Sequence, residues 1–84
     1  MNFTNDDELY QVIGSNIKLF REKSGLTQVQ LSEKLQISIS YLSKIEAHGC
    51  NKSVSISLLN HVANVLNIDI IEFFKRRNTY GQKS

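Results

Sequence analysis

The stretch LTQVQLSEKLQISISYLSKIEAHG, residues 26–49, decides the fold of this 84-residue chain. Thr27 is a good N-cap residue, and Gln30, three positions later, completes a capping box. Leu31 and Leu35 are four positions apart and therefore share one face of a helix. A helix this short is not stable alone, so its apolar face must pack against another part of the chain.

A second short helix is predicted directly after a tight turn. Residues 36–38 interrupt the first helical pattern, and Ser38 provides another N-cap signal. Leu42 and Ile45 then supply the apolar stripe of the second helix. A short helix held outward by a tight turn against another helix suits the major groove of DNA.

Residues 13–74 resemble the Cro/C1-type (XRE, lambda-repressor-like) helix-turn-helix family. That family follows the pattern L-T-Q-x-x-L-A-x-x-x-G-V-S-x-x-x-I-S-x-x-E. Its matching positions here are Leu26, Thr27, Gln28, Leu31, Ile37, Ser38, Leu42, Ser43 and Glu46. Two departures are Ser32, where the family prefers Ala, and Gln36, where it prefers Gly, and they suggest a less ideal turn. The resemblance implies an all-α, five-helix lambda-repressor-like DNA-binding domain with the motif at helices 2 and 3.

The flanking sequence contains the signals for the other helices. The first helix is expected to begin near Asp6 after the cap residue Asn5 and to end at Gly25. A later helix is expected between the cap residue Ser55 and Asn67, a residue that tolerates the left-handed conformation. Asp69 and Glu72 form another capping-box pattern that predicts a fifth helix. Its apolar residues are Ile70, Ile71, Phe73 and Phe74.

The chain is expected to form one domain with short extensions at both ends. Residues 1–12 read as an acidic N-terminal extension of the first helix, residues 13–76 as the helix-turn-helix domain with its motif at 28–47, and residues 77–84 as a basic flexible tail. The loop after the second motif helix is longer than the commonest family form by about two residues. No internal repeat or linker is evident.

Composition limits the cellular context and the classes of partner. The single cysteine excludes an intrachain disulfide and fits a reducing compartment. The sequence shows no membrane-spanning run and no signal-peptide pattern, so a cytoplasmic protein without membrane contact is expected. Residues 1–12 carry a formal charge of −3 and the remainder +5, and such a basic domain fits phosphate binding. The abundance of Asn, Ile and Lys suggests an AT-rich bacterial or phage source.

Contacts to DNA phosphates set the register of a DNA-binding protein. By resemblance, Gln28 grips a phosphate at the start of the first motif helix, where free backbone N–H groups and the helix dipole also favour an anion. Arg21 and Glu46 occupy family positions that often form a salt bridge, which would aim Arg21 at a phosphate. The expected phosphate contacts are Lys18, Arg21, Gln28, Ser38, Tyr41, Asn51 and Lys52.

Base contacts are expected from the exposed face of the second motif helix. The candidates are Ile39, Ser40, Ser43 and Lys44. Lys44 suits guanine O6 or N7, Ile39 suits a thymine methyl group, and both serines suit several base edges. The set lacks Arg, Gln and Asn, so DNA shape is expected to contribute to specificity.

Enzymatic and metal-dependent functions find little support. The chain contains no G-x-S-x-G, Walker A or H-E-x-x-H motif. His48, Cys50 and His61 are too scattered for a good zinc site, and a catalytic Cys50 would lack an oxyanion hole. We therefore expect no catalytic activity, no metal and no cofactor, with redox sensing by Cys50 as a minor alternative.

The fifth helix contains more apolar surface than one small core absorbs. Neighbouring helix positions point about 100° apart, so adjacent apolar residues cannot all face inward. An exposed apolar face often marks an interface, which is expected here at Ile70, Ile71, Phe73 and Phe74. The alternative is a broad core face packed under the first helix.

The sequence thus predicts a sequence-specific transcriptional regulator. The favoured form is a repressor that binds double-stranded DNA as a homodimer on a two-fold symmetric operator. Two alternatives remain open: a regulator with a protein partner, such as the antitoxin of a toxin–antitoxin pair, and a restriction–modification controller protein.

Overall fold

The computed structural model describes residues 2–48 and 54–77. Within these ranges the chain forms four α-helices and no strand: α1 (Asp6–Lys23), α2 (Gln28–Leu35), α3 (Ile39–His48) and α4 (Ile56–Leu66). A single 3₁₀ helix, η1 (Ile70–Phe74), follows them. The all-α prediction is therefore confirmed for the described residues, and η1 occupies the place of the fifth α-helix.

The fifth helix differs from the prediction because its expected capping box does not form. The Asp69 side chain accepts a hydrogen bond from the Ile71 N–H, one residue short of Glu72. The Glu72 carboxylate turns instead toward Arg77 and Lys75, at 2.7 and 3.1 Å. Only five residues are helical, and the tighter 3₁₀ form occurs in proteins mainly as short pieces.

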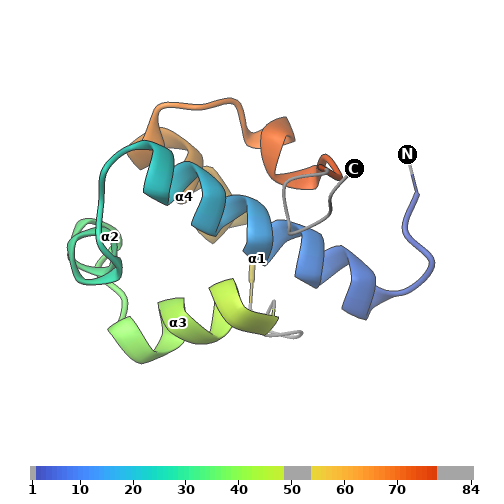
Figure 1. Cartoon of the computed structure of the whole chain (residues 1–84), viewed down its shortest axis with the longest axis horizontal. Coiled ribbons are helices and arrows are strands. Elements are labelled where there is room, and N and C mark those ends of the chain that lie inside the picture. Colours follow the sequence, from blue (N-terminus) through green and yellow to red (C-terminus); the bar gives the residue numbers. More distant parts are fainter. Residues whose placement is uncertain (1, 49–53, 78–84) are drawn as a thin grey trace.

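Helix α1 lies through the middle of the molecule (Figure 1). It packs mainly against α3 and against η1, while α2 contacts α3 and α4. The apolar residues predicted at helical spacing supply the core. The buried members are Val12, Ile13, Ile17, Leu31, Leu35, Leu42, Ile45, Leu59, Val62, Ala63, Leu66 and Phe73.

The predicted N-caps form as expected. At each one, a side-chain oxygen accepts a hydrogen bond from the backbone N–H three residues later, which satisfies a donor that the helix leaves open. These cap residues are Asn5, Thr27, Ser38 and Ser55. The capping box is complete at Thr27, whose backbone N–H donates to Oε1 of Gln30 at 2.9 Å. The start of each α-helix is thus specified by side chains within a few residues of it.

Three of the α-helices end in the same way, with one residue in the left-handed conformation. Gly25 ends α1 with φ of 75°, Gln36 ends α2 with φ of 62°, and Asn67 ends α4 with φ of 59°. In each case the next N–H bonds back to the helix, as Ile37 does to the Ser32 carbonyl at 3.1 Å. The residue after each turn is apolar and packs against the core: Leu26, Ile37 and Ile68. Each turn therefore both closes a helix and anchors the chain that follows.

We expect Gln36→Gly to raise the free energy of unfolding by about 1 kcal/mol, because the left-handed conformation costs a residue with a Cβ about that much. The side chain lost is exposed, so little packing is removed. Urea unfolding measures the change. Gly25→Ala is the matched control: its new Cβ would meet no atom within 4 Å, so its expected loss reports the backbone cost alone. A lower stability of Gln36→Gly would contradict the prediction.

A buried asparagine on α1 holds the end of the described chain. The Asn16 side chain is fully buried and donates to the backbone carbonyls of Phe73 and Lys75, at 2.9 and 2.8 Å. Its Oδ1 accepts from Nε of Arg77 at 2.8 Å. Arg77 was expected in the flexible tail at 77–84, and these contacts place it in the folded domain instead. Residues 78–84 lie outside the described ranges.

The acidic N-terminal extension is continuous with α1 and contacts Arg76, near the end of the described residues. Arg76 pairs with Glu8 at 2.8 Å and stacks over the Phe3 ring, 4.4 Å from its centroid. Hydrogen bonds from the Thr4 backbone and from Arg76 lower the pKa of the Glu8 carboxyl. Arg77 and Lys75 lower the pKa of the Glu72 carboxyl in the same way. The acidic N-terminal extension and the basic residues after η1 thus pair part of their opposite charge within the domain, through Glu8 and Arg76.

Candidate nucleic-acid interface

Helix α3 is fixed by its buried face and presents the opposite face to solvent. Leu42 and Ile45 are each only 1% exposed, and they attach the helix to the core. Ile39 is 43% exposed, although it is a large apolar residue. Ser40 and Lys44 are exposed as well. Three of the four predicted base-contact residues therefore lie at the surface of this helix.

Ser43, the fourth predicted base-contact residue, is placed differently. It is half-buried, and its hydroxyl donates a hydrogen bond to Oε1 of Gln28 at 3.0 Å. The side chain thus links α3 to the first residue of α2. Ala47 was not predicted, but it is exposed at the end of this face. Ala47 lies three positions after Lys44 and seven after Ser40, and this helical spacing would have placed it on the same face. Its side chain carries no hydrogen-bonding group.

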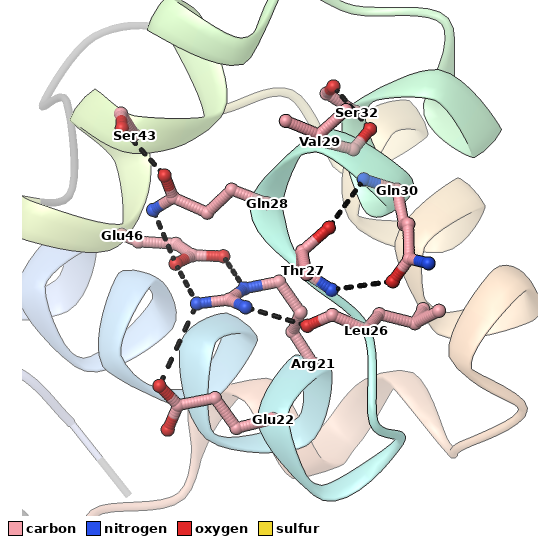
Figure 2. A network of polar contacts seen from close by, with 10 residues as sticks. All are labelled: Arg21, Glu22, Leu26, Thr27, Gln28, Val29, Gln30, Ser32, Ser43 and Glu46. Atoms are coloured by element: carbon pink, nitrogen blue, oxygen red, sulfur yellow. Dashed lines mark hydrogen bonds and ion pairs between the residues drawn. The ribbon is translucent and has the colours of Figure 1, made fainter.

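The predicted ion pair between α1 and α3 forms and is buried (Figure 2). Nε and Nη2 of Arg21 donate to the two carboxylate oxygens of Glu46 at 2.7 and 3.0 Å. Nη1 of Arg21 donates to the Leu26 carbonyl at 2.7 Å. Arg21 and Glu46 are only 8% and 6% exposed. The pair therefore fixes the angle of α3 relative to α1.

The expected role of Arg21 as a phosphate contact stays a prediction, while its pairing within the domain is clear. All three guanidinium nitrogens donate within the domain, and the charge is neutralised by a buried carboxylate. A guanidinium carries five N–H groups, so these three hydrogen bonds leave one N–H on each of Nη1 and Nη2, although Arg21 is only 8% exposed. Arg21 thus joins α1 to α3 through its buried pair with Glu46.

Both the nitrogen and the oxygen of the Gln28 side-chain amide form hydrogen bonds. Nε2 donates to Oε1 of Glu46 at 3.0 Å, and Oε1 accepts from Ser43 at 3.0 Å. Figure 2 shows this amide between α2 and α3. Gln28 is half-buried at the N-terminus of α2, so part of its side chain remains accessible. The side chain of Gln28 can therefore donate to a phosphate only through the amide N–H that does not bond to Glu46.

The remaining phosphate candidates fall into three groups. Lys18 is exposed on α1, and Ser38 is exposed at the start of α3, where its hydroxyl caps the helix. Tyr41 is half-buried and packs against the core. Asn51 and Lys52 lie outside the described residues, as does Cys50. The structure therefore keeps Lys18 and Ser38 as accessible polar groups.

The predicted dimer residues are also divided by the structure. Phe73 is 0% exposed, and its ring meets that of Phe20 edge to face at 6.3 Å. It belongs to the core, which corrects its assignment to a dimer interface. Ile71 is 53% exposed, while Ile70 and Phe74 are half-buried. One side of η1 thus enters the core, and Ile71 remains at the surface.

Among residues 2–48 and 54–77, no group of three or more His, Cys, Asp or Glu side chains is placed to hold a metal ion. No helix in the same part of the chain is long and apolar enough to cross a lipid bilayer.

The fold and the exposed face of α3 define a helix-turn-helix protein. A family model described as "Helix-turn-helix" matches residues 17–73, which is most of the chain. The chain belongs to the Cro/C1-type (XRE) helix-turn-helix family. This confirms the family resemblance found in the sequence.

Individual relatives agree with this assignment. The chain is 45% identical over 58 residues to the immunity repressor protein of Bacillus phage phi105, covering 69% of this chain and 39% of that protein. It is 36% identical over 72 residues to the HTH-type transcriptional regulator SlrR of Bacillus subtilis (strain 168), covering 86% and 47%. The chain thus spans less than half the length of both curated relatives.

A solved structure shares the fold. The crystal structure of SinR, the master regulator for biofilm formation, in complex with DNA matches with a TM-score of 0.68 and 33% identity. The match covers 75% of this chain and 98% of that one.

Proposed function

We propose that this chain is a sequence-specific DNA-binding transcriptional regulator, a repressor that acts as a homodimer on a two-fold symmetric operator. The observation that carries the proposal is the exposed face of α3, with Ile39, Ser40 and Lys44 at the surface of a helix locked to the core. A rigid helix with free polar groups can read base edges in the major groove. The relatives support this function, since one is a repressor and another was crystallised with DNA.

Phosphate binding would fix the position of α3 in the groove. The N-terminus of α2 begins at Gln28, where open backbone N–H groups and the helix dipole favour an anion. The remaining amide N–H of Gln28 and the Lys18 ammonium would add to this attraction. Asn51 and Lys52 keep the role that the family resemblance implies for them.

Dimerisation would give the protein enough specificity. One domain reads only a few base pairs, too few to select one site in a genome. A two-fold pair doubles the site and sets the half-sites about 34 Å apart. We place the dimer interface at Ile71, the exposed residue of η1, with Ile70 and Phe74 beside it. Such a surface contacts its own copy in a two-fold dimer.

The experiment is selection of bound sequences from a random double-stranded DNA library, followed by titration of the enriched operator. Lys44→Ala should relax the preference at one base pair, by about 1–3 kcal/mol if its contact is direct. Lys18→Ala removes the same charge from an exposed position on α1 and should weaken binding to all DNA sequences alike. Loss of Lys18, the phosphate contact, should also reduce the salt dependence of binding.

Two results would count against the proposal. If the wild type enriches no sequence from the library, the chain is not a sequence-specific DNA-binding protein. If Lys44→Ala and Lys18→Ala weaken every sequence equally, Lys44 contacts phosphate and the readout assigned to α3 is wrong.

A further inference from the structure

A continuous chain of hydrogen bonds connects the buried ion pair to the half-buried Ser43 on α3 (Figure 2). It starts at Arg21, which donates to both carboxylate oxygens of Glu46. Oε1 of the same carboxylate accepts from Nε2 of Gln28 at 3.0 Å. Oε1 of Gln28 in turn accepts from the Ser43 hydroxyl at 3.0 Å. Four side chains from α1, α2 and α3 are thus joined in series.

Arg21, the first residue of this series, determines which group donates in each of the later hydrogen bonds. An arginine guanidinium has only donors, so both oxygens of Glu46 that face it must accept. The Gln28 amide must then present its NH₂ group to Glu46, because its carbonyl would meet an oxygen that can only accept. This fixes the amide orientation, which is otherwise ambiguous for glutamine. The carbonyl of Gln28 is left facing Ser43, so Ser43 must be the donor.

A serine hydroxyl has one proton and two acceptor lone pairs. The proton of Ser43 is used in the bond to Gln28, so toward a ligand this hydroxyl offers only lone pairs. We infer that Ser43 is a specificity-determining residue that acts only as a hydrogen-bond acceptor. This inference rests on the proposed function, in which α3 lies in the major groove.

The consequence is a preference between bases on the strand that Ser43 faces. Adenine N6 and cytosine N4 are the donors in the major groove, whereas guanine O6 and N7 and thymine O4 are acceptors. An acceptor-only hydroxyl favours adenine or cytosine over guanine or thymine at one position. A free serine hydroxyl would accept either class, since it can rotate to donate or accept. One neutral hydrogen bond corresponds to a preference of about two- to tenfold.

The test measures base preferences at every operator position for the wild type, Ser43→Ala and Gln28→Met. Ser43→Ala should abolish the adenine/cytosine preference at one position and leave the others unchanged. Gln28→Met keeps the hydroxyl and the approximate side-chain volume but removes the acceptor that takes its proton. The adenine/cytosine preference should therefore fall toward equality in this variant. Gln28→Ala serves as a second variant, and Lys44→Ala should leave this position unaffected.

Each outcome decides the inference. A wild type that enriches a defined operator, with Ser43→Ala unchanged at every position, would show that Ser43 reads no base. An adenine/cytosine preference that persists in both folded Gln28 variants would show that Gln28 does not set the polarity of Ser43. In both cases the proposed function stands and only this inference fails. If the wild type enriches no sequence, the proposed function fails first, and the inference fails with it.

Discussion

Replacing Phe73 by alanine should lower the free energy of unfolding by about 3–5 kcal/mol, which is the usual cost of truncating a buried phenylalanine. Phe73 is 0% exposed, and its ring packs edge to face on Phe20 at 6.3 Å. Small domains are stable by only about 5–15 kcal/mol in total. The variant should therefore unfold at much lower urea concentration, and its thermal midpoint should fall by at least about 12 °C.

Phe74→Ala is the matched control, because it removes the same ring from the adjacent, half-buried position. We expect it to cost less than half as much stability. Sedimentation of both variants adds a second readout, since Phe74 borders the proposed dimer interface at Ile71. Equal losses of stability from the two substitutions would contradict the assignment of Phe73 to the core. If both variants remain folded dimers, the interface lies elsewhere on the domain.

Arg21→Met should destabilise the domain by about 3–5 kcal/mol, because it leaves the Glu46 carboxylate buried without its charged partner. Glu46 is 6% exposed and accepts two hydrogen bonds from Arg21. The substitution retains much of the aliphatic bulk of arginine, so the loss would report the charge and its hydrogen bonds. Urea unfolding of the purified variant measures the change.

Two comparison variants make this prediction specific. The double substitution Arg21→Met with Glu46→Leu should recover much of the lost stability, because replacing a whole buried ion pair by apolar groups is often nearly neutral. Lys75→Met breaks a more exposed pair with Glu72, whose side chains are 47% and 29% exposed, and should cost much less stability. An equally small loss for Arg21→Met would show that the buried pair contributes no more than a surface pair.

The local sequence determined where the four α-helices begin and how three of them end. Each boundary depends on groups within a few residues of one another, such as the Thr27 side chain with the Gln30 backbone. A short-range signal of this kind can be read without knowing the fold. The Arg21–Glu46 pair was predicted only because a known family uses the same two positions, since 25 residues separate them in the chain.

Tertiary contacts decided what the sequence left open. The apolar pattern of 70–74 could not distinguish the buried Phe73 from its neighbours, because that choice depends on how η1 meets α1. Asn16 was not singled out from the sequence, because its carbonyl partners lie 57 and 59 positions away. Ser43 was expected to donate or accept freely.

The hydrogen-bonding polarity of the Ser43 hydroxyl is instead set by three other side chains: Arg21 on α1, Gln28 on α2 and Glu46 on α3. The sequence by itself determined the four α-helices, because those follow from local hydrogen bonds and apolar spacing, and its motif residues determined the family. The orientations of Asn16, Arg21, Gln28 and Ser43 depend on partners distant in sequence, and only the tertiary structure brings these together.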